Sequence, residues 1–206
     1  VVDEIEYLIK EKGVEQIAFL DDTFVAWADR TEKICDLIIE RKLKFKWWCY
    51  ARVRGFAPSL IKKMKKAGCY ALNFGVESGN QDLLNRMKKN ITKKEVWDAI
   101  TAAKENGLMV HASFMVGLPG DTKKTVMQTI NWAIKLSPDV ALFCIVTPFP
   151  GTELQDEAKR SGWIKENVEW DQMGLHMHTN FHNDDLSNKE IYNLYKLATK
   201  KFYFRP

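Results

Sequence analysis

The sequence predicts an α/β fold built from consecutive βα units, and two observations carry that prediction. Short apolar runs of strand length alternate with segments whose apolar residues recur at helical spacing, a pattern typical of parallel sheets whose strands are joined by helices. Glycines stand where the predicted helices end, because glycine enters the left-handed conformation at little cost. The five predicted strands are 17–20, 45–50, 70–75, 109–116 and 140–146, and the terminating glycines are Gly68, Gly107 and Gly162.

The predicted helices also carry start signals. A capping box places a short polar residue before the helix and an acid or amide three residues later, so that free backbone N–H groups are satisfied reciprocally. Three pairs have the capping spacing: Asp29 with Glu32, Thr92 with Glu95, and Ser187 with Glu190.

Helical apolar spacing already begins at Val1. In a chain of alternating strands and helices we therefore expect a strand before this helix.

The composition indicates a soluble cytoplasmic protein. A chain of 206 residues that is 46% hydrophobic can bury one large core. The net charge of +4 comes from lysine and arginine interleaved with acids, which indicates a solvated surface rather than a nucleic-acid patch. We find no signal-peptide pattern and no apolar run near the roughly 20 residues of a membrane span. The four scattered cysteines predict reduced, mostly buried thiols.

The alternating rhythm stops near Gly162, where tryptophans and a histidine-rich stretch precede a last helix. We therefore expect a core over residues 1–165 and a carboxy-terminal appendage over residues 166–206.

Polar and glycine-rich residues follow all five predicted strands. Because the carboxyl ends of parallel strands meet at one edge, such residues predict a ligand site there. The candidate ligand-binding residues are Asp21, Asp22, Arg52, Glu77, Ser78, Gly117, Leu118, Thr147 and Pro148 at the strand ends, and Ser113 within the fourth strand.

Two interpretations of Glu77 are open. Its carboxylate, followed by Ser78 and Gly79, is placed to accept the hydroxyls of a ribose beside backbone that a ligand can approach closely. It could equally neutralise the dipole of the helix that begins near Gln81.

The other strand ends have similar alternatives. The Gly117 turn could aim backbone amides at a ligand or be a plain tight turn, with Asp121 or Thr122 as the helix cap. Ser113 could bond a ligand or be a small core residue. The prolines after Thr147 could hold backbone groups against a base edge or only stiffen a loop.

Of the paired acids Asp21 and Asp22, one is expected to face the site, because adjacent side chains on an extended chain point to opposite sides. Arg52 could bind a carboxylate or phosphate, or pair with Asp21, Asp22 or Glu77.

Other candidate sites are weaker. His176, His178 and His182 would share one face of an extended segment, but they lie outside the βα pattern, so we predict no metal site. His111, on a strand, fits an interior histidine. No nucleophile has an adjacent base, so we name no catalytic residue and exclude a self-contained hydrolase.

Taken in order, five segments resemble the radical S-adenosylmethionine (radical SAM) superfamily, and among its branches the one whose members often carry a cobalamin-binding domain. The segments are DDTF at 21–24, WCYAR at 48–52, GVESG at 75–79, GLPG at 117–120 and PFPGT at 148–152. The resemblance covers residues 1–170.

The resemblance implies a partial TIM-type (βα)6 barrel missing its first strand, with a short C-terminal α-rich appendage. It implies that the parent protein holds a [4Fe-4S] cluster on a CxxxCxxC loop and cleaves S-adenosylmethionine reductively to a 5′-deoxyadenosyl radical. Glu77 matches the ribose-binding acid and Ser113 a strand position that contacts the nucleoside. The Gly117 turn and residues 147–148 would flank the adenine, and residues 20–23 would hold the methionyl amino group.

Some features depart from the family. No CxxxCxxC exists in the chain, Asp21-Asp22 replaces the common Gly-Gly-Glu, and Tyr50 stands where some relatives have an acid. We therefore expect the cluster ligands to lie outside this chain and the chain alone not to turn over. The parent would need a small-molecule substrate and an electron-donor protein, and cobalamin would enter through a further domain.

Three functions stay open. The first is the core of a radical SAM enzyme, with methyl transfer through cobalamin as one form. The second is an RNA- or protein-modifying methylthiotransferase-like enzyme, and the third is a degenerate, non-catalytic barrel that binds a nucleoside or a partner. Upstream cysteines would separate the first two from the third.

Overall fold

The computed structural model describes residues 1–54, 57–164 and 181–205. His176 and His178, two of the three histidines considered for a metal, lie outside the described residues. The strands are β1 (Gln16–Phe19), β2 (Lys46–Ala51), β3 (Cys69–Glu77), β4 (Met109–Val116) and β5 (Val140–Ile145). The helices are α1 (Val2–Lys12), α2 (Ala28–Glu40), α3 (Pro58–Lys66), α4 (Gln81–Arg86), α5 (Lys93–Glu105), α6 (Lys123–Leu136), α7 (Glu153–Arg160) and α8 (Asn188–Tyr203), with a short 3₁₀ helix, η1 (Phe24–Ala26).

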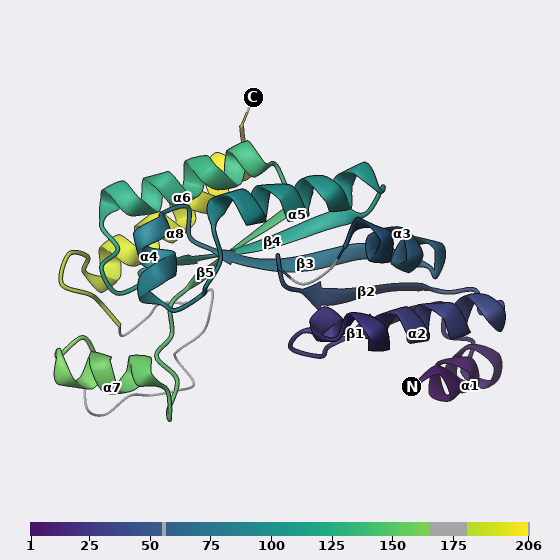
Figure 1. The fold of residues 1–206 in the computed structure, drawn as a ribbon. Helices are drawn as coiled ribbons and strands as arrows, with labels where there is room; N and C mark the ends of the chain where they lie inside the picture. The colour runs from purple at the N-terminus through teal and green to yellow at the C-terminus, as the bar shows by residue number, and fades with distance from the viewer. Residues whose placement is uncertain (55–56, 165–180, 206) are drawn as a thin grey trace. The chain divides into compact units, whose positions relative to one another are not determined.

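The five strands form one sheet in the order β1-β2-β3-β4-β5 (Figure 1). β1 pairs parallel with β2, and β2 pairs parallel with β3. Every connection between successive strands contains at least one helix. The α/β fold with alternating strands and helices is therefore confirmed, and β4 has the predicted bounds.

The observed helix starts confirm one of the three predicted capping pairs and contradict another. Ser187 and Glu190 form the predicted capping box at the start of α8. The pairing of Asp29 with Glu32 is wrong, because α2 already begins at Ala28, after Trp27, without a side-chain cap. Asp29 instead lies in the first turn, where a negative charge favours the helix dipole. α5 begins directly after Thr92, and the box with Glu95 stays a prediction.

Gly68, Gly107 and Gly162, the predicted helix terminators, have φ values of 95°, 70° and 69°. All three therefore adopt the left-handed region that the sequence pattern requires. No helix in the described part of the chain combines the length and apolar character needed to cross a membrane.

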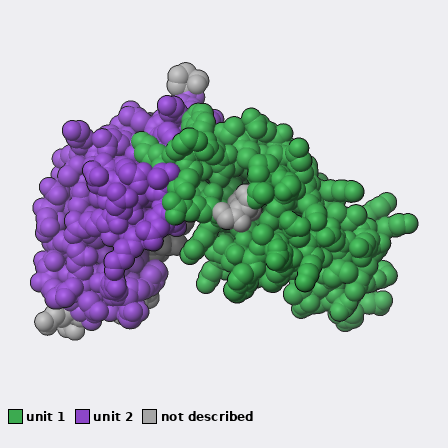
Figure 2. All heavy atoms as spheres, viewed as in Figure 1, with its two compact units in different colours: residues 1–75, 93–112, 138–140 green, residues 76–92, 113–137, 141–206 purple. Residues whose placement is uncertain are grey.

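The chain forms two compact units, coloured separately in Figure 2. The first unit contains residues 1–75, 93–112 and 138–140, and the second contains residues 76–92, 113–137 and 141–206. The division at residue 165 that the sequence suggested stays a prediction.

The first unit buries one side of β2 and leaves the other side partly exposed. Trp47, Cys49 and Ala51 alternate along β2 as buried residues. The indole N–H of Trp47 donates to the carbonyl of Ala67 at 2.8 Å, which satisfies the only polar atom of this fully buried ring.

In the second unit α8 packs against α6, and the two helices lie side by side in Figure 1. Phe114 of β4 stacks on Phe143 of β5 with ring centroids 5.3 Å apart, and Phe143 meets Phe202 of α8 at 6.3 Å. The hydroxyl of Tyr203 donates to the carbonyl of Ala141 at 3.0 Å and accepts from its N–H at 3.2 Å. α8 is therefore part of the core of this unit.

The start of α8 is also held electrostatically. Lys123, the first residue of α6, lies 2.8 Å from the Glu190 carboxylate. The hydrogen bond from Lys123, together with those from the backbone and hydroxyl of Ser187, lowers the pKa of Glu190 to about 2.

We expect this carboxylate to make folding sensitive to acid. A lowered pKa in the folded state stabilises the protein fully above the ordinary value of 4.5, and this contribution is lost as the pH falls through about 2. Denaturation monitored by circular dichroism at pH 6 and pH 3 should show a larger loss of stability for the native chain than for Glu190→Gln. Glu4→Gln, in α1, controls for the loss of one carboxylate; equal acid sensitivity of the native chain and Glu190→Gln would contradict the assignment.

Candidate functional site

The third strand ends in a strained turn centred on Glu77. This residue has φ 67°, a left-handed value that non-glycine residues rarely adopt. The N–H of Ser78 donates to the carbonyl of Val76 at 2.9 Å, which closes a three-residue turn around Glu77. A residue with this geometry costs on the order of 1–3 kcal/mol and persists only where its surroundings hold it. Such strain clusters at functional sites, so Glu77 is the strongest candidate of the sequence-derived set.

The surroundings that hold the turn belong to α6. The hydroxyl of Thr129 accepts from the N–H of Gly79 at 3.0 Å and lies 3.3 Å from the hydroxyl of Ser78. A Cβ on Gly79 would stand 2.6 Å from the carbonyl oxygen of Gln128, so only glycine permits this approach. The next residue, Asn80, caps α4 by accepting from the N–H of Leu83 at 3.0 Å.

The carboxylate of Glu77 is held on one side only. Its Oε1 accepts from Lys89 Nζ at 2.7 Å, and its side chain is 16% exposed. Oε2 has no hydrogen bond to any residue that the structure describes, so it can accept from a ligand hydroxyl. The alternative role, at the dipole of α4, is taken by the Asn80 cap and Asp82 in the first turn. Ribose binding by Glu77 stays a prediction that this geometry favours.

The side chain of Ser78 is engaged within the protein, so its ligand role stays a prediction without a free hydroxyl to support it. It is buried, and its hydroxyl accepts from the N–H of Asn80 at 3.1 Å. Its N–H is engaged in the turn around Glu77. Ser78 therefore serves to dock the turn on α6.

The Gly117 turn is organised around the buried carboxylate of Asp121. One oxygen of Asp121 accepts from the N–H groups of Gly117 and Leu118, both at 3.0 Å, and the other accepts from the Thr125 hydroxyl at 2.6 Å. Burial raises the pKa of Asp121, while these hydrogen bonds oppose the rise. The amide of Asn183 donates to the carbonyls of Leu118 and Asp121 at 2.9 and 3.0 Å.

The expectation that these backbone amides face a ligand is therefore wrong, because Asp121 already accepts from both. The helix cap is Thr122, which forms a capping box with Thr125. Gly117 itself has φ 91° and is buried, and Leu118 is 5% exposed. A ligand contact of this loop would have to use groups other than those two N–H donors.

The segment after β5 is stiffened by its own hydrogen bonds. The N–H of Phe149 donates to the carbonyl of Thr147 at 3.0 Å across Pro148, and the Thr152 hydroxyl donates to the carbonyl of Phe149 at 2.7 Å. The Thr147 hydroxyl contacts the carbonyl of Ile145 at 3.4 Å. The predicted free backbone edge is thus partly occupied, although a carbonyl has a second lone pair for a ligand.

The remaining predicted residues are distributed over both units. Ser113 is half-buried on β4 in the second unit. Asp21, Asp22 and Arg52 are exposed and belong to the first unit. Asp21 pairs with Arg30 at 3.2 Å, so none of the ion pairs considered for Arg52 forms with a described residue. Their ligand roles stay predictions.

The cysteines do not fit a metal cluster. Cys35, Cys49 and Cys69 are buried, and burial raises the pKa of all three thiols, that of Cys35 to about 12. None of these cysteines belongs to a CxxxCxxC motif. The described residues contain no group of three histidine, cysteine or acidic side chains that could hold a metal ion. His111 lies on β4, and burial lowers its pKa, which favours the neutral form.

A chain of buried polar groups joins two of the loops in the second unit. Asp121 accepts from Thr125, the carbonyl of Thr125 accepts from the Thr129 hydroxyl at 3.2 Å, and Thr129 holds Gly79. Thr125 and Thr129 are four positions apart on one face of α6, and Asp121 lies in the loop just before the helix cap Thr122. Sequence reasoning missed them and Lys89, although the four-residue spacing of polar residues in an amphipathic helix was a usable signal.

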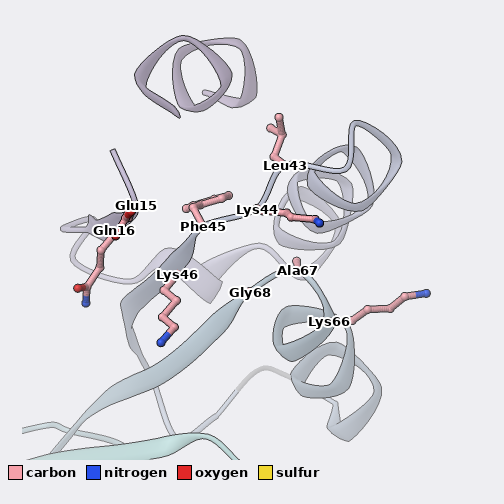
Figure 3. Close-up of a pocket in the computed structure, with 9 residues that line it drawn as sticks. All are labelled: Glu15, Gln16, Leu43, Lys44, Phe45, Lys46, Lys66, Ala67 and Gly68. Atoms are coloured by element: carbon pink, nitrogen blue, oxygen red, sulfur yellow. The ribbon is translucent and has the colours of Figure 1, made fainter. Parts of the chain in front are cut away.

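A cavity of about 570 Å³ lies elsewhere, at the amino ends of β1 to β3 in the first unit (Figure 3). It is lined by Glu15, Lys44, Phe45, Lys46 and Lys66, among others. The ammonium groups of the three lysines point in different directions in Figure 3 rather than toward one point. Ligands of parallel α/β sheets bind at the carboxyl ends of the strands, so this cavity is not the site that the strand ends predict.

Comparison with known proteins identifies the family. The model of the Radical SAM superfamily matches residues 1–133. An uncharacterized methyltransferase of Pyrococcus horikoshii is 34% identical over 212 aligned residues, which cover 100% of this chain and 44% of that protein. An anaerobic magnesium-protoporphyrin IX monomethyl ester cyclase of Rubrivivax gelatinosus is 31% identical over 159 residues, which cover 76% of this chain and 29% of that protein.

Among solved structures, the radical S-adenosylmethionine methyltransferase TsrM of Kitasatospora setae, with cobalamin and a [4Fe-4S] cluster bound, has a TM-score of 0.70. The identity is 20%, and the match covers 81% of this chain and 32% of that one, so it supports the shared fold alone. The chain spans less than half the length of these curated relatives.

The contact of Gly79 with α6 gives a stability prediction. In Gly79→Ala the new Cβ would meet a carbonyl oxygen at 2.6 Å and the Thr129 Cα at 2.7 Å, both of them backbone atoms. We expect a loss of about 1–3 kcal/mol in the free energy of unfolding, measured by urea denaturation.

Gly162→Ala is the matched control in the same unit, because no atom lies within 4 Å of its added Cβ and only its left-handed φ opposes the change. We expect it to cost about 1 kcal/mol. If the Gly79 variant proved no less stable than the Gly162 variant, the close packing of this turn on α6 would be disproved.

Proposed function

Because the chain belongs to the radical SAM superfamily, we propose that its second compact unit binds the nucleoside of S-adenosylmethionine, with Glu77 as the acceptor for the ribose hydroxyls. One observation carries this proposal: a strained turn holds the Glu77 carboxylate partly buried, with Oε1 paired to Lys89 and Oε2 open to a ligand. A carboxylate at a strand end accepts ribose hydroxyls in dinucleotide sites by the same chemistry.

The neighbouring strand ends have supporting roles in this proposal. Ser113 on β4 and the carbonyls of Thr147 and Pro148 after β5 would contact the nucleoside through polar atoms. The rigid segment around Pro148 favours recognition of a planar base, because little backbone freedom is lost on binding. Gly117 and Leu118 would contribute shape rather than amide donors, since Asp121 takes both N–H groups.

The iron–sulfur cluster does not fit the residues of this chain. A [4Fe-4S] cluster needs cysteine thiolates, and the chain has no CxxxCxxC spacing, while three of its four cysteines are buried. We therefore propose that the cluster ligands are supplied by residues outside this chain, and that this chain alone does not turn over. We therefore assign no cluster-dependent step of the reaction to residues of this chain.

For the whole protein we propose a radical SAM enzyme that transfers a methyl or related group to a small molecule. When bound, S-adenosylmethionine would supply a methyl group or, after one-electron reduction that releases methionine, a 5′-deoxyadenosyl radical. The methyltransferase name of the Pyrococcus horikoshii relative supports group transfer. We propose cobalamin, which the TsrM structure contains, as an additional cofactor of the whole protein. An electron-donor protein would be required by the same proposal.

A second candidate is a barrel that binds a nucleoside or a partner without catalysis. The observation in its favour is the absence of the cluster motif from the chain, while the nucleoside side of the site keeps its strained turn. A CxxxCxxC loop encoded upstream of Val1 in the same gene would decide for the enzyme.

Calorimetry with S-adenosylmethionine tests the nucleoside site. We expect the 206-residue chain to bind it weakly, because the groups that would hold the methionyl end through a cluster are missing. Glu77→Gln removes a charged acceptor, and hydrogen bonds to charged groups contribute about 1.5–3 kcal/mol, so affinity should fall about 10- to 100-fold.

Glu157→Gln is the control. Glu157 lies on α7, pairs with Arg86 of α4 at 2.8 Å, and is not a residue of the proposed site. Its affinity should equal that of the native chain. Binding that is indifferent to Glu77→Gln, or equally weakened in both variants, would rule out Glu77 as the ribose acceptor.

A further inference from the structure

We infer that Lys89 is a positioning residue of the nucleoside site, and that its ammonium group fixes which oxygen of Glu77 meets the ribose. Lys89 is not among the residues that the strand ends predicted. The inference rests on the proposed function, because it concerns how Glu77 is presented to the same ligand.

The ion pair of Lys89 differs in burial from that of the preceding lysine. Lys88 lies 2.7 Å from Glu153, and the two side chains are 73% and 86% exposed. Lys89 also lies 2.7 Å from its partner Glu77, but these side chains are 33% and 16% exposed. Exposed pairs contribute about 0–1 kcal/mol, whereas removing one partner of a buried pair leaves an uncompensated charge. Of the two neighbouring lysines, only Lys89 therefore controls a carboxylate that is largely withdrawn from water.

The residues on both sides of Lys89 adopt the left-handed backbone conformation. Lys88 and Asn90 have φ values of 55° and 54°, and Glu77 has 67°. The described residues contain five non-glycine residues with positive φ, so three of the five flank or form this one ion pair. Unfavourable backbone conformations persist where the surrounding structure stabilises them, and a fully exposed salt bridge would contribute too little to do so.

The local structure explains how α4 places Lys89. After the helix ends at Arg86, the N–H of Lys88 donates to the carbonyl of Asn85 and that of Lys89 to the carbonyl of Leu84, both at 3.0 Å. This closes the helix with Lys88 in the left-handed position that glycine usually fills. The side-chain amide of Gln81 then donates to the carbonyl of Ile91 at 2.9 Å and ties down the far side of the segment. Lys89 is consequently delivered to Glu77 by a fixed turn.

The consequence for a ligand follows from the geometry of the carboxylate. With Oε1 engaged by Lys89, the Glu77 side chain cannot rotate freely, and Oε2 is presented in one orientation. A hydroxyl that meets Oε2 gains a charge-assisted hydrogen bond, which is stronger than a neutral one. Without Lys89 the carboxylate would lose this orientation, and the ability to distinguish a ribose from a 2′,3′-dideoxyribose should fall with it.

The alternative is a structural role, in which Lys89 only ties α4 to β3. Such a role would weaken all ligands of the site equally, because it would act through folding. A positioning role predicts a selective loss for ligands that carry the hydroxyl bonded to Glu77. Adenosine and 2′,3′-dideoxyadenosine, which lacks both of the ring hydroxyls that Glu77 could accept from, therefore separate the two roles.

The experiment titrates the native chain and the variants Lys89→Gln, Lys89→Arg, Lys88→Gln and Glu77→Gln with each nucleoside, followed by NMR. We expect Lys89→Gln to bind adenosine about tenfold more weakly, equivalent to about 1.4 kcal/mol, with little change for 2′,3′-dideoxyadenosine. Lys89→Arg keeps the charge and should restore the preference to within about threefold. Lys88→Gln should match the native chain, because its partner is exposed.

The outcomes are distinguishable. If Glu77→Gln loses the preference for adenosine while Lys89→Gln keeps it, or if Lys89→Gln weakens both nucleosides equally, the positioning role is overturned and the ribose acceptor stands. If the native chain shows no preference for adenosine, the proposed function and this inference fail together. If Lys89→Gln does not fold, we compare the preference for adenosine over the dideoxynucleoside in Lys89→Arg with that in Lys88→Gln. A preference in Lys89→Arg below one third of that in Lys88→Gln overturns the inference.

Discussion

The architecture of the candidate site depends on a short chain of buried and partly buried hydrogen bonds that runs from the loop before α6 along its first turns. Asp121, Thr125 and Thr129 are four residues apart and link the loop after β4 to the turn after β3. Each of these polar groups is satisfied by another, which is the condition for burying them at all. The left-handed Glu77 could not persist without this support, because its turn is closed by one hydrogen bond and anchored through Gly79. Hydrogen bonds from α6 therefore stabilise the left-handed conformation of Glu77.

The same logic explains why so much of the conspicuous sequence serves the scaffold. Glycine-rich loops are often interpreted as ligand cradles, yet the amides of Gly117 and Leu118 are saturated by Asp121. Ser78, adjacent to the candidate acid, is turned into the protein toward α6. What is left for a ligand is a small number of groups, above all one carboxylate oxygen. A site of this kind achieves selectivity through the orientation of a few polar groups. The residues that orient Glu77 therefore matter more than the number of residues that contact the ligand.

The sequence was sufficient to predict the alternating strands and helices and to name Glu77 as a candidate, and insufficient to find the residues that hold its turn. β4 and the capping box at Ser187 follow from local pattern, which is why they were predictable, and Trp27 shows how a helix can begin without a recognisable cap. Thr129 lies 50 positions from Gly79, and only the folded chain brings them together. Lys89 was missed for a related reason, since its role comes from a helix-closing turn with a lysine in the position where glycine is usual.

The separation between the nucleoside side and the cluster side of the chemistry has a physical basis. The contacts that hold Glu77, from Thr129, Gly79 and Lys89, all come from the second compact unit. None of them involves a cysteine, and three of the four thiols are buried in the first unit. The contacts that hold the strained turn therefore involve none of the thiols. The nucleoside site that we propose at Glu77 consequently does not depend on a cysteine of this chain.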